Sequence, residues 1–112
     1  MIGIILNRKL ELEELSQVSD GAGGFVSNWT TLGTLWGRLR PGSGRESLGG
    51  TVVLSSAPYV IIVRAAPFGA PSRPRPDQRF RAGARVFRIL AVSDDDRDAA
   101  YLTCRCIEEV AG

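Results

Sequence analysis

The alternation of apolar and polar residues in the first third of the chain predicts two β-strands joined by a tight turn. Within residues 7–15, leucines alternate with charged neighbours, which is the period of a half-buried strand. Residues 19–24 are rich in glycine, which supplies the positive φ angles of a hairpin turn. Residues 25–39 are rich in β-branched and aromatic side chains, which favours a second strand with a bend at Gly33 or Gly37.

The remaining two thirds of the chain predict further short strands. Residues 59–64 contain four consecutive β-branched side chains, so both faces of that strand are apolar and we expect it in a central position or against a partner. Residues 79–81, 85–92 and 100–108 predict three more strands, the last two joined by the acidic turn 93–98. The fold class is therefore mainly β, a small antiparallel barrel or sandwich of five or six strands, because closure of the sheet removes exposed edges.

Two segments interrupt this pattern. The Gly- and Ser-rich residues 41–57 predict a long flexible loop between the second and third strands. Residues 65–76 contain four prolines, with Arg73 and Arg75 between them, and predict a stiff, extended, basic excursion. The length of the chain fits a single domain over residues 1–112.

The composition argues against an enzyme. The chain has no histidine, which removes histidine-based acid–base catalysis and the usual activation of a Ser or Cys nucleophile. Cys104 and Cys106 lie two residues apart and are interpreted as small core residues, since zinc requires four ligands. We expect no cofactor and no metal. No apolar run reaches transmembrane length, and Trp29 and Trp36 are assigned to core or hairpin packing.

Charge is distributed unevenly, although the net charge is only +2. Seven arginines and one acid, Asp77, lie between Arg64 and Arg88, and an acidic stretch follows at 94–98. Patches of opposite charge can attract other copies of the chain or a ring-shaped assembly that lies above it. The alternative is that both patches are ordinary solvated surface. A second alternative is a nucleic-acid-binding small β-barrel that uses Arg79, Arg81, Arg85 and Arg88 with Phe80 and Phe87.

Several segments, in order and spacing, resemble one known family. They are Asp20–Phe25 with Trp29, Trp36–Pro41, Gly44–Glu46, Tyr59–Arg64, Arg79–Arg81 with Gly83, Arg85–Ile89 and Tyr101–Cys104. Together they resemble the head–tail joining (head–tail adaptor) proteins of tailed phages and gene transfer agents, and among these the head-closure or stopper type. The resemblance covers about residues 10–109. The segment 65–76 departs from it, because the family usually has a short linker there.

The resemblance implies a structural subunit of the head–tail connector ring in the particle neck, assembled in the bacterial cytoplasm. Copies of the chain would form a ring homo-oligomer, with the portal or adaptor protein above and the tail terminator or tail tube below. Packaged double-stranded DNA would pass through the channel and be retained there, and no membrane is involved. Another neck or tail component, such as a tail terminator, is the alternative within this class.

Two groups of residues are the expected sites of contact. The first lines the DNA channel or grips a neighbouring subunit, and comprises Arg38, Arg40, Gly44, Arg45, Glu46, Ser47 and Leu48. Its arginines meet either DNA phosphates or acidic groups of a neighbouring subunit, and the subunit contact is favoured. The second forms the interface with the next subunit or partner ring, and comprises Arg64, Arg73, Arg75, Arg79, Arg81, Asp94, Asp95 and Asp96.

Overall fold

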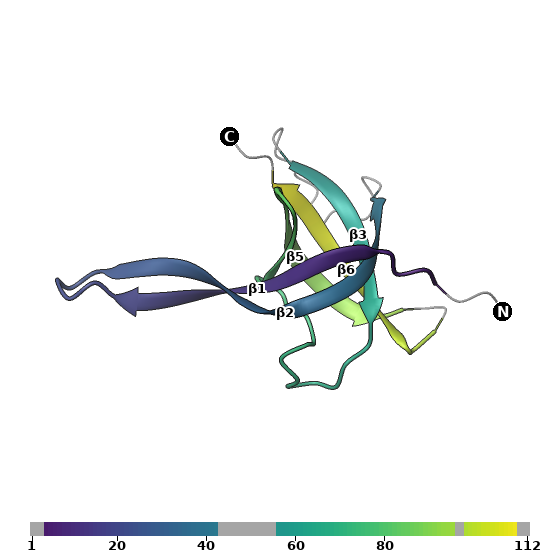
Figure 1. The fold of residues 1–112 in the computed structure, drawn as a ribbon, viewed down its shortest axis with the longest axis horizontal. Coiled ribbons are helices and arrows are strands. Elements are labelled where there is room, and N and C mark those ends of the chain that lie inside the picture. The colour runs from purple at the N-terminus through teal and green to yellow at the C-terminus, as the bar shows by residue number, and fades with distance from the viewer. Residues whose placement is uncertain (1–3, 43–55, 96–97, 110–112) are drawn as a thin grey trace.

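The described part of the chain is built from antiparallel strands. The structure, a computed structural model, describes residues 4–42, 56–95 and 98–109. Within these ranges it contains six strands and no helix: β1 (Arg8–Ser19), β2 (Phe25–Pro41), β3 (Ser56–Arg64), β4 (Arg79–Ala82), β5 (Arg85–Asp94) and β6 (Tyr101–Glu109) (Figure 1). The mainly β class predicted from the sequence is confirmed. No helix in these ranges is long and apolar enough to cross a lipid bilayer.

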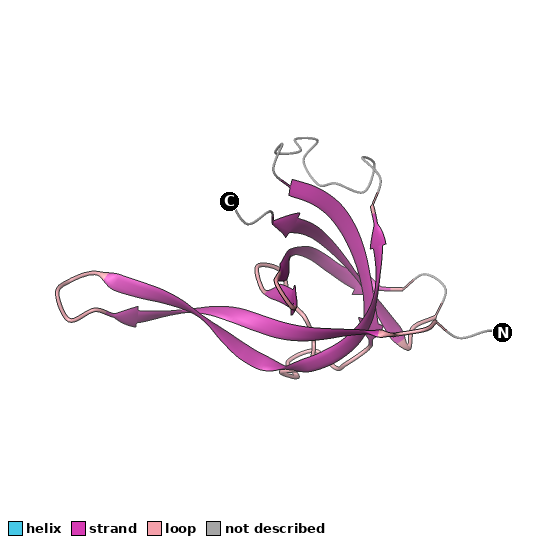
Figure 2. Ribbon diagram, turned by 45° about the horizontal axis from the view of Figure 1, so that its top comes forward, coloured by secondary structure: helices cyan, strands magenta, loops and turns pink. Residues whose placement is uncertain are grey.

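The strands close into a barrel (Figure 2), and their order around it is β1-β2-β3-β6-β5-β4. The short strand β4 completes the ring, because it pairs with β5 on one side and with residues 11–13 of β1 on the other. Closure gives every strand of the barrel two neighbours, and protection of strand edges is the reason that the sequence pattern favoured a closed sheet.

The barrel is filled by alternate residues of all six strands. Phe80 and Phe87 are cross-strand partners at its centre, and both are completely buried. The other buried members of the core are Leu10, Leu12, Ile61, Val63, Ile89, Leu102, Cys104 and Cys106. The interpretation of the two cysteines as core residues is confirmed. Burial raises the pKa of Cys104 to about 12 and raises that of Cys106 as well, so both thiols stay protonated at neutral pH.

The outer face of β3 is covered by the N-terminal segment. Val60 and Ile62 point outward from the barrel, yet both are buried, because Ile4 and Leu6 pack against them together with Tyr101. This second small cluster explains why β3 is apolar on both faces, as its central position in the sequence pattern predicted.

The β1–β2 hairpin extends well beyond the barrel. From Glu14 onward β1 pairs only with β2, and β2 reaches β3 only from Gly37. Residues 14–31 therefore form a two-stranded projection, called the arm below, that accounts for the elongated shape of 57 × 33 × 24 Å (Figure 1). The sequence predicted the hairpin, but not that it would leave the barrel.

The arm begins at an irregularity in the β1–β2 pairing. Leu12 pairs with Gly33 and Glu13 with Thr31, so Leu32 is the extra residue of a bulge. A bulge bends the strand and increases its twist, which redirects the hairpin away from the barrel wall. It lies beside Gly33, one of the two positions at which the sequence predicted a bend.

Candidate functional site

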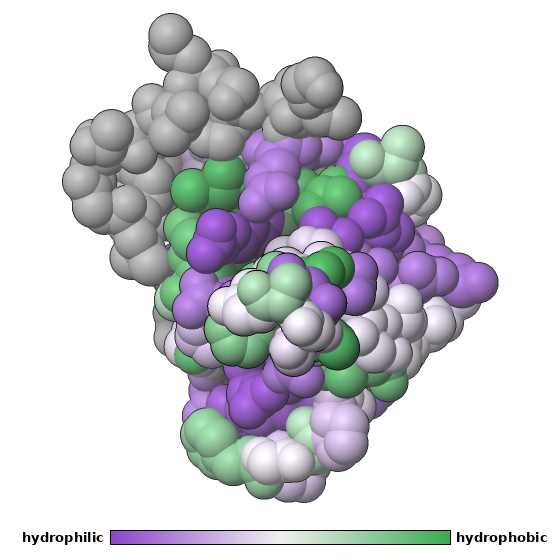
Figure 3. Space-filling model, turned by 90° about the vertical axis from the view of Figure 1, so that its left-hand side faces the viewer, coloured by the Kyte–Doolittle hydropathy of each residue, from purple (hydrophilic) through white to green (hydrophobic). Residues whose placement is uncertain are grey.

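The arm is the part of the molecule that exposes the most apolar surface. Among the described residues, seven large apolar side chains are exposed, and four of them lie on the arm: Leu15, Val18, Phe25 and Val26. Val18 and Val26 form a cross-strand pair, and Phe25 is 70% exposed. Figure 3 views the molecule from the side of the arm and shows apolar and polar residues mixed on this surface. Exposed apolar groups on a projecting ribbon make the arm a candidate interaction surface.

The tip of the arm is held in one conformation by Asp20. Its Oδ1 accepts hydrogen bonds from the backbone N–H groups of Ala22 at 2.8 Å and Gly24 at 3.0 Å. Gly21 and Gly23 adopt φ angles of 81° and 86°, which favour glycine. These two backbone hydrogen bonds lower the pKa of Asp20, so the tip carries one negative charge at neutral pH.

The root of the arm is fixed by a buried acid. Glu13 is only 6% exposed and accepts hydrogen bonds from the Nε atoms of Arg79 at 2.6 Å and Arg81 at 3.2 Å. The guanidinium of Arg79 also lies 4.0 Å from the centre of the Trp29 ring on the arm. A buried carboxylate without a partner is strongly destabilising, so these contacts hold β1 against β4 where the arm begins.

The excursion between β3 and β4 braces the root from a second side. Glu14 forms an ion pair with Arg75 and accepts a hydrogen bond from Gln78 Nε2 at 3.4 Å. Gln78 in turn accepts a hydrogen bond from the backbone N–H of Arg75 at 2.8 Å. Arg73 donates to the carbonyl of Ala66 at 2.9 Å, and its guanidinium stacks on Phe68. Residues 65–76 are therefore folded against the chain itself.

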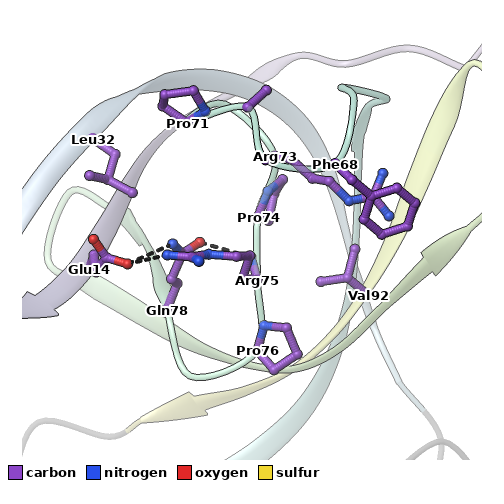
Figure 4. Close-up of a pocket in the computed structure, with 12 residues that line it drawn as sticks. Glu14, Leu32, Phe68, Pro71, Arg73, Pro74, Arg75, Pro76, Gln78 and Val92 are labelled. Carbon is purple, nitrogen blue, oxygen red and sulfur yellow. Dashed lines mark hydrogen bonds and ion pairs between the residues drawn. The ribbon is translucent and has the colours of Figure 1, made fainter.

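A cavity of about 520 Å³ lies between the excursion and the root of the arm (Figure 4). Its walls are mostly proline and other apolar groups, including Leu32, Phe68, Pro71, Pro74 and Val92. Of its charged groups, Glu14 and Arg75 are paired with each other, as the dashed lines in Figure 4 show, and Arg73 is bound to Ala66 and Phe68. The cavity holds no convergent set of reactive groups, and within the described residues no three His, Cys, Asp or Glu side chains are placed to bind a metal ion.

A further ion pair joins β5 to β6 on the barrel wall. Arg85 donates to both carboxylate oxygens of Glu108, at 2.7 and 3.0 Å, and to the hydroxyl of Tyr59 at 3.0 Å. The hydrogen bond from Arg85 lowers the pKa of Glu108 and raises that of Arg85 itself. This pair stabilises the barrel.

The outer face of β2 carries an exposed tryptophan beside basic residues. Trp36 is 54% exposed, pairs across the sheet with Lys9, and is followed on the same face by Arg38 and Arg40. The assignment of Trp36 to core or hairpin packing is therefore wrong, because the alternation of β2 turns Leu35, Gly37 and Leu39 inward instead. Trp29 is half-buried beneath Arg79.

The residues predicted to form the subunit interface are placed in two different settings. Arg75, Arg79 and Arg81 bind Glu13 or Glu14 at the root of the arm, and Arg73 meets partners within the excursion. Arg64 and Asp94 are exposed at strand ends. Asp95 is buried and accepts a hydrogen bond from Thr103 Oγ1 at 2.9 Å, whereas Asp96 lies outside the described residues.

The predicted channel group is described only in part. Arg38 and Arg40 are exposed on β2, whereas Gly44, Arg45, Glu46, Ser47 and Leu48 lie outside the described residues. The arm surface and the partners of Glu13 and Glu14 were not predicted from the sequence. Their adjacency was visible in the sequence, but their partners lie more than 60 positions further along the chain.

The structure also bears on the nucleic-acid-binding alternative. Phe80 and Phe87 are fully buried in the barrel and cannot stack on bases. Each of the arginines named for that role has an acidic partner in the chain: Glu13 for Arg79 and Arg81, Glu108 for Arg85, and Asp77 for Arg88. The two phenylalanines and four arginines that this alternative names therefore do not form an exposed stacking platform.

Comparisons with known proteins agree with this architecture. A family model described as phage head completion protein matches residues 1–110. A chain of the virion of a native gene transfer agent particle is 53% identical, with a TM-score of 0.78, over 98% of this chain and 100% of that one. Protein SF1141 from Shigella flexneri 2a is 19% identical over 90% of both chains, with a TM-score of 0.65, and shows a shared fold. No curated protein matches significantly.

The family match spans nearly the whole chain and includes every strand of the barrel and the arm. The resemblance of the sequence to head–tail joining proteins is thereby confirmed. Proteins of this kind are structural components of the virion. The chain belongs to the phage head completion protein family.

Proposed function

We propose that this protein is a non-enzymatic structural subunit of the head–tail connector ring in the neck of a tailed phage or gene transfer agent particle. The observation that carries the proposal is the full-length likeness, at 53% identity, to a chain of a gene transfer agent virion. The physical design supports it as well. A closed, well-filled barrel provides a rigid body, and the arm offers a surface for contact with other subunits.

In this proposal the subunits form a homo-oligomeric ring between two other parts of the particle. The portal or adaptor protein lies above it, and the tail terminator or tail tube lies below. A ring requires a heterologous contact, in which one surface of each subunit meets a different surface of the next. Arg64 and Asp94 are exposed at strand ends and remain candidates for contacts with the next subunit or a partner ring.

Packaged double-stranded DNA would pass through the centre of this ring and be retained there. Arg38 and Arg40 belong to β2 immediately before the segment 43–55, and both are exposed. They are candidates for contacts with phosphates or with acids of a neighbouring subunit, together with the loop residues Gly44, Arg45, Glu46, Ser47 and Leu48. Phosphate contacts of this kind would hold DNA without reading its sequence.

The experiment that tests the proposed function is removal of the protein from particle-producing cells, followed by electron microscopy of the particles. We expect DNA-filled heads that lose their DNA and carry no tails. Supplying the intact chain from a plasmid restores tailed particles and serves as the control. Normal tailed particles in the absence of the protein would reject the proposal.

A further inference from the structure

We propose that the arm of one copy docks on the outer face of β2 of the next copy, around Trp36, so that arms link the subunits head to tail. This inference rests on the proposed ring, and it names the two surfaces that close the ring. It assigns a role to the arm and to Trp36.

The charge of the arm indicates a protein partner and excludes a nucleic-acid one. Between Lys9 and Arg38 the chain contains four acidic residues and no Lys or Arg. A segment without cations cannot neutralise phosphates, which supply most of the affinity of proteins for DNA. The tip instead offers Phe25, Val26 and the single negative charge of Asp20.

The chain carries a surface that complements this tip. Apart from the arm, the exposed large apolar side chains among the described residues are Ile5, Trp36 and Phe68. Phe68 is stacked against the guanidinium of Arg73 at 3.8 Å, so it is already engaged. Trp36 lies beside Lys9 and Arg38 on the outer face, which pairs an aromatic ring with positive charge. Trp and Arg are the residue types that most often dominate protein interfaces.

The two surfaces are also placed as a head-to-tail contact requires. The arm leaves the barrel at one end of the long axis, and the start of β1 lies towards the opposite end (Figure 1). Lys9 is the second residue of β1 and pairs with Trp36, so this pair lies far from the arm tip. A projection on one side and its complement on the other give a heterologous contact that closes by rotation.

Docking also removes a weakness of the isolated subunit. A two-stranded ribbon without further neighbours is marginally stable in water, and this one exposes apolar groups on both faces. Contact with a neighbouring copy would bury Phe25 and Val26 against Trp36. The two hydrogen bonds to Asp20 hold the tip in a fixed shape beforehand, which lowers the entropy lost on docking.

The test is cross-linking within purified particles that carry Ser27→Cys on the arm and Thr34→Cys beside Trp36. Both positions are exposed, and neither substitution removes Phe25 or Trp36. The two positions lie seven residues apart on one strand, roughly 23 Å, so a short bismaleimide cannot join them within a chain. The native cysteines are buried and protonated, so they do not react with the maleimide. We expect a ladder of covalently linked multimers on a denaturing gel.

Matched controls identify the contact. Each single cysteine variant should give no ladder, and neither should Ser27→Cys combined with Ser93→Cys, an exposed position on β5. Adding Trp36→Ser to the reactive pair should abolish the ladder, whereas adding Phe68→Ser should leave it unchanged. A ladder from the Ser93 pair that equals that of the Thr34 pair, or one that survives Trp36→Ser, would overturn the inference.

The outcomes also separate this inference from the proposed function. Particles that contain the protein but give no ladder would overturn the docking of the arm on Trp36. The proposed function as a neck subunit would be unaffected. Cross-links from Ser27→Cys to a different virion protein would do the same and identify the true partner of the arm. Absence of the wild-type chain from purified particles would instead reject the proposed function, and with it the inference.

Discussion

The barrel and the arm of this protein use the same kinds of side chain for opposite purposes. In the barrel every strand has two neighbours, and Phe80 and Phe87 are completely buried. In the arm each strand has one neighbour, and Phe25 is largely exposed. The apolar residues of the barrel therefore stabilise the subunit, whereas those of the arm are available to a partner. Hydrophobic content alone does not distinguish a core from an interface.

The two regions are joined by charged groups. Glu13 and Glu14 lie where β1 leaves the barrel, and each is held by arginines from β4 or the preceding excursion. Arg73, Arg85 and Arg88 also have partners within the chain, so most of the arginines of the basic stretch are engaged within the subunit. These contacts hold the arm against the barrel. We therefore expect substitutions in the core to lower the free energy of unfolding most, those at the root of the arm less, and those at its tip least.

The largest expected difference in stability is between a substitution in the barrel core and one at the tip of the arm. Phe87→Ala should lower the free energy of unfolding by about 3–5 kcal/mol, because it removes a buried ring and leaves a cavity. Phe25→Ala should change it by less than about 0.5 kcal/mol, since that ring is exposed. Urea denaturation followed by fluorescence measures both. Equal losses would show that the arm is part of the folding core.

The next effect concerns the junction of barrel and arm. Arg79→Ala should lower the free energy of unfolding by up to about 3 kcal/mol, because Glu13 is buried and would keep only Arg81 as a partner. The matched control is Arg88→Ala, which removes an exposed ion pair with Asp77 and should cost less than about 1 kcal/mol. A neutral Arg79→Ala would contradict the role assigned to Glu13.

Two glycines of β2 give a finer comparison. A Cβ added at Gly37 would lie 2.7 Å from Leu10 Cδ1 and 3.1 Å from the backbone oxygen of Ile62, so Gly37→Ala should cost about 1–3 kcal/mol. A Cβ at Gly33 would meet nothing within 4 Å, so Gly33→Ala should be neutral or slightly stabilising. Thermal unfolding of the two variants decides this. Similar melting temperatures would refute the close packing inferred at Gly37.

The smallest effect is the dependence of stability on pH through Glu108. Because Arg85 lowers the pKa of Glu108 in the folded state, this contribution is present above the ordinary glutamate pKa of about 4.3 and is lost as the pH falls through the lowered value. Arg85→Gln should therefore destabilise the protein slightly at pH 7, and the difference should shrink in acid. Urea denaturation at both pH values measures it, with Glu109→Gln as an exposed control. A difference that grows in acid would contradict the assignment.

Much of the fold could be predicted from the sequence because strands have a short period. Alternating leucines, glycine-rich turns and the doubly apolar residues 59–64 were sufficient to find the strands and the closed antiparallel sheet. The covering of Val60 and Ile62 by Ile4 and Leu6 could not be foreseen, because it depends on the path of a segment without periodicity. The projection of the arm depends on a bulge, which the sequence marked only by Gly33.

The site was less predictable than the fold, because charge patterns show which residues are charged but not which residues they meet. Arg75 and Glu14 are 61 positions apart, and Arg79 and Glu13 are 66 apart. A basic stretch in the sequence therefore indicated an outward-facing patch where the structure has internal braces. The family, in contrast, was evident from the order of short segments, each of which is undistinguished by itself.

The most direct test of the central claim is a cryo-electron microscopy map of the neck of intact particles. We expect a ring of this chain between head and tail, in which the arm of each subunit lies across Trp36 of the next. A neck without this chain, or a ring whose arms point into solvent or onto a different protein, would contradict it.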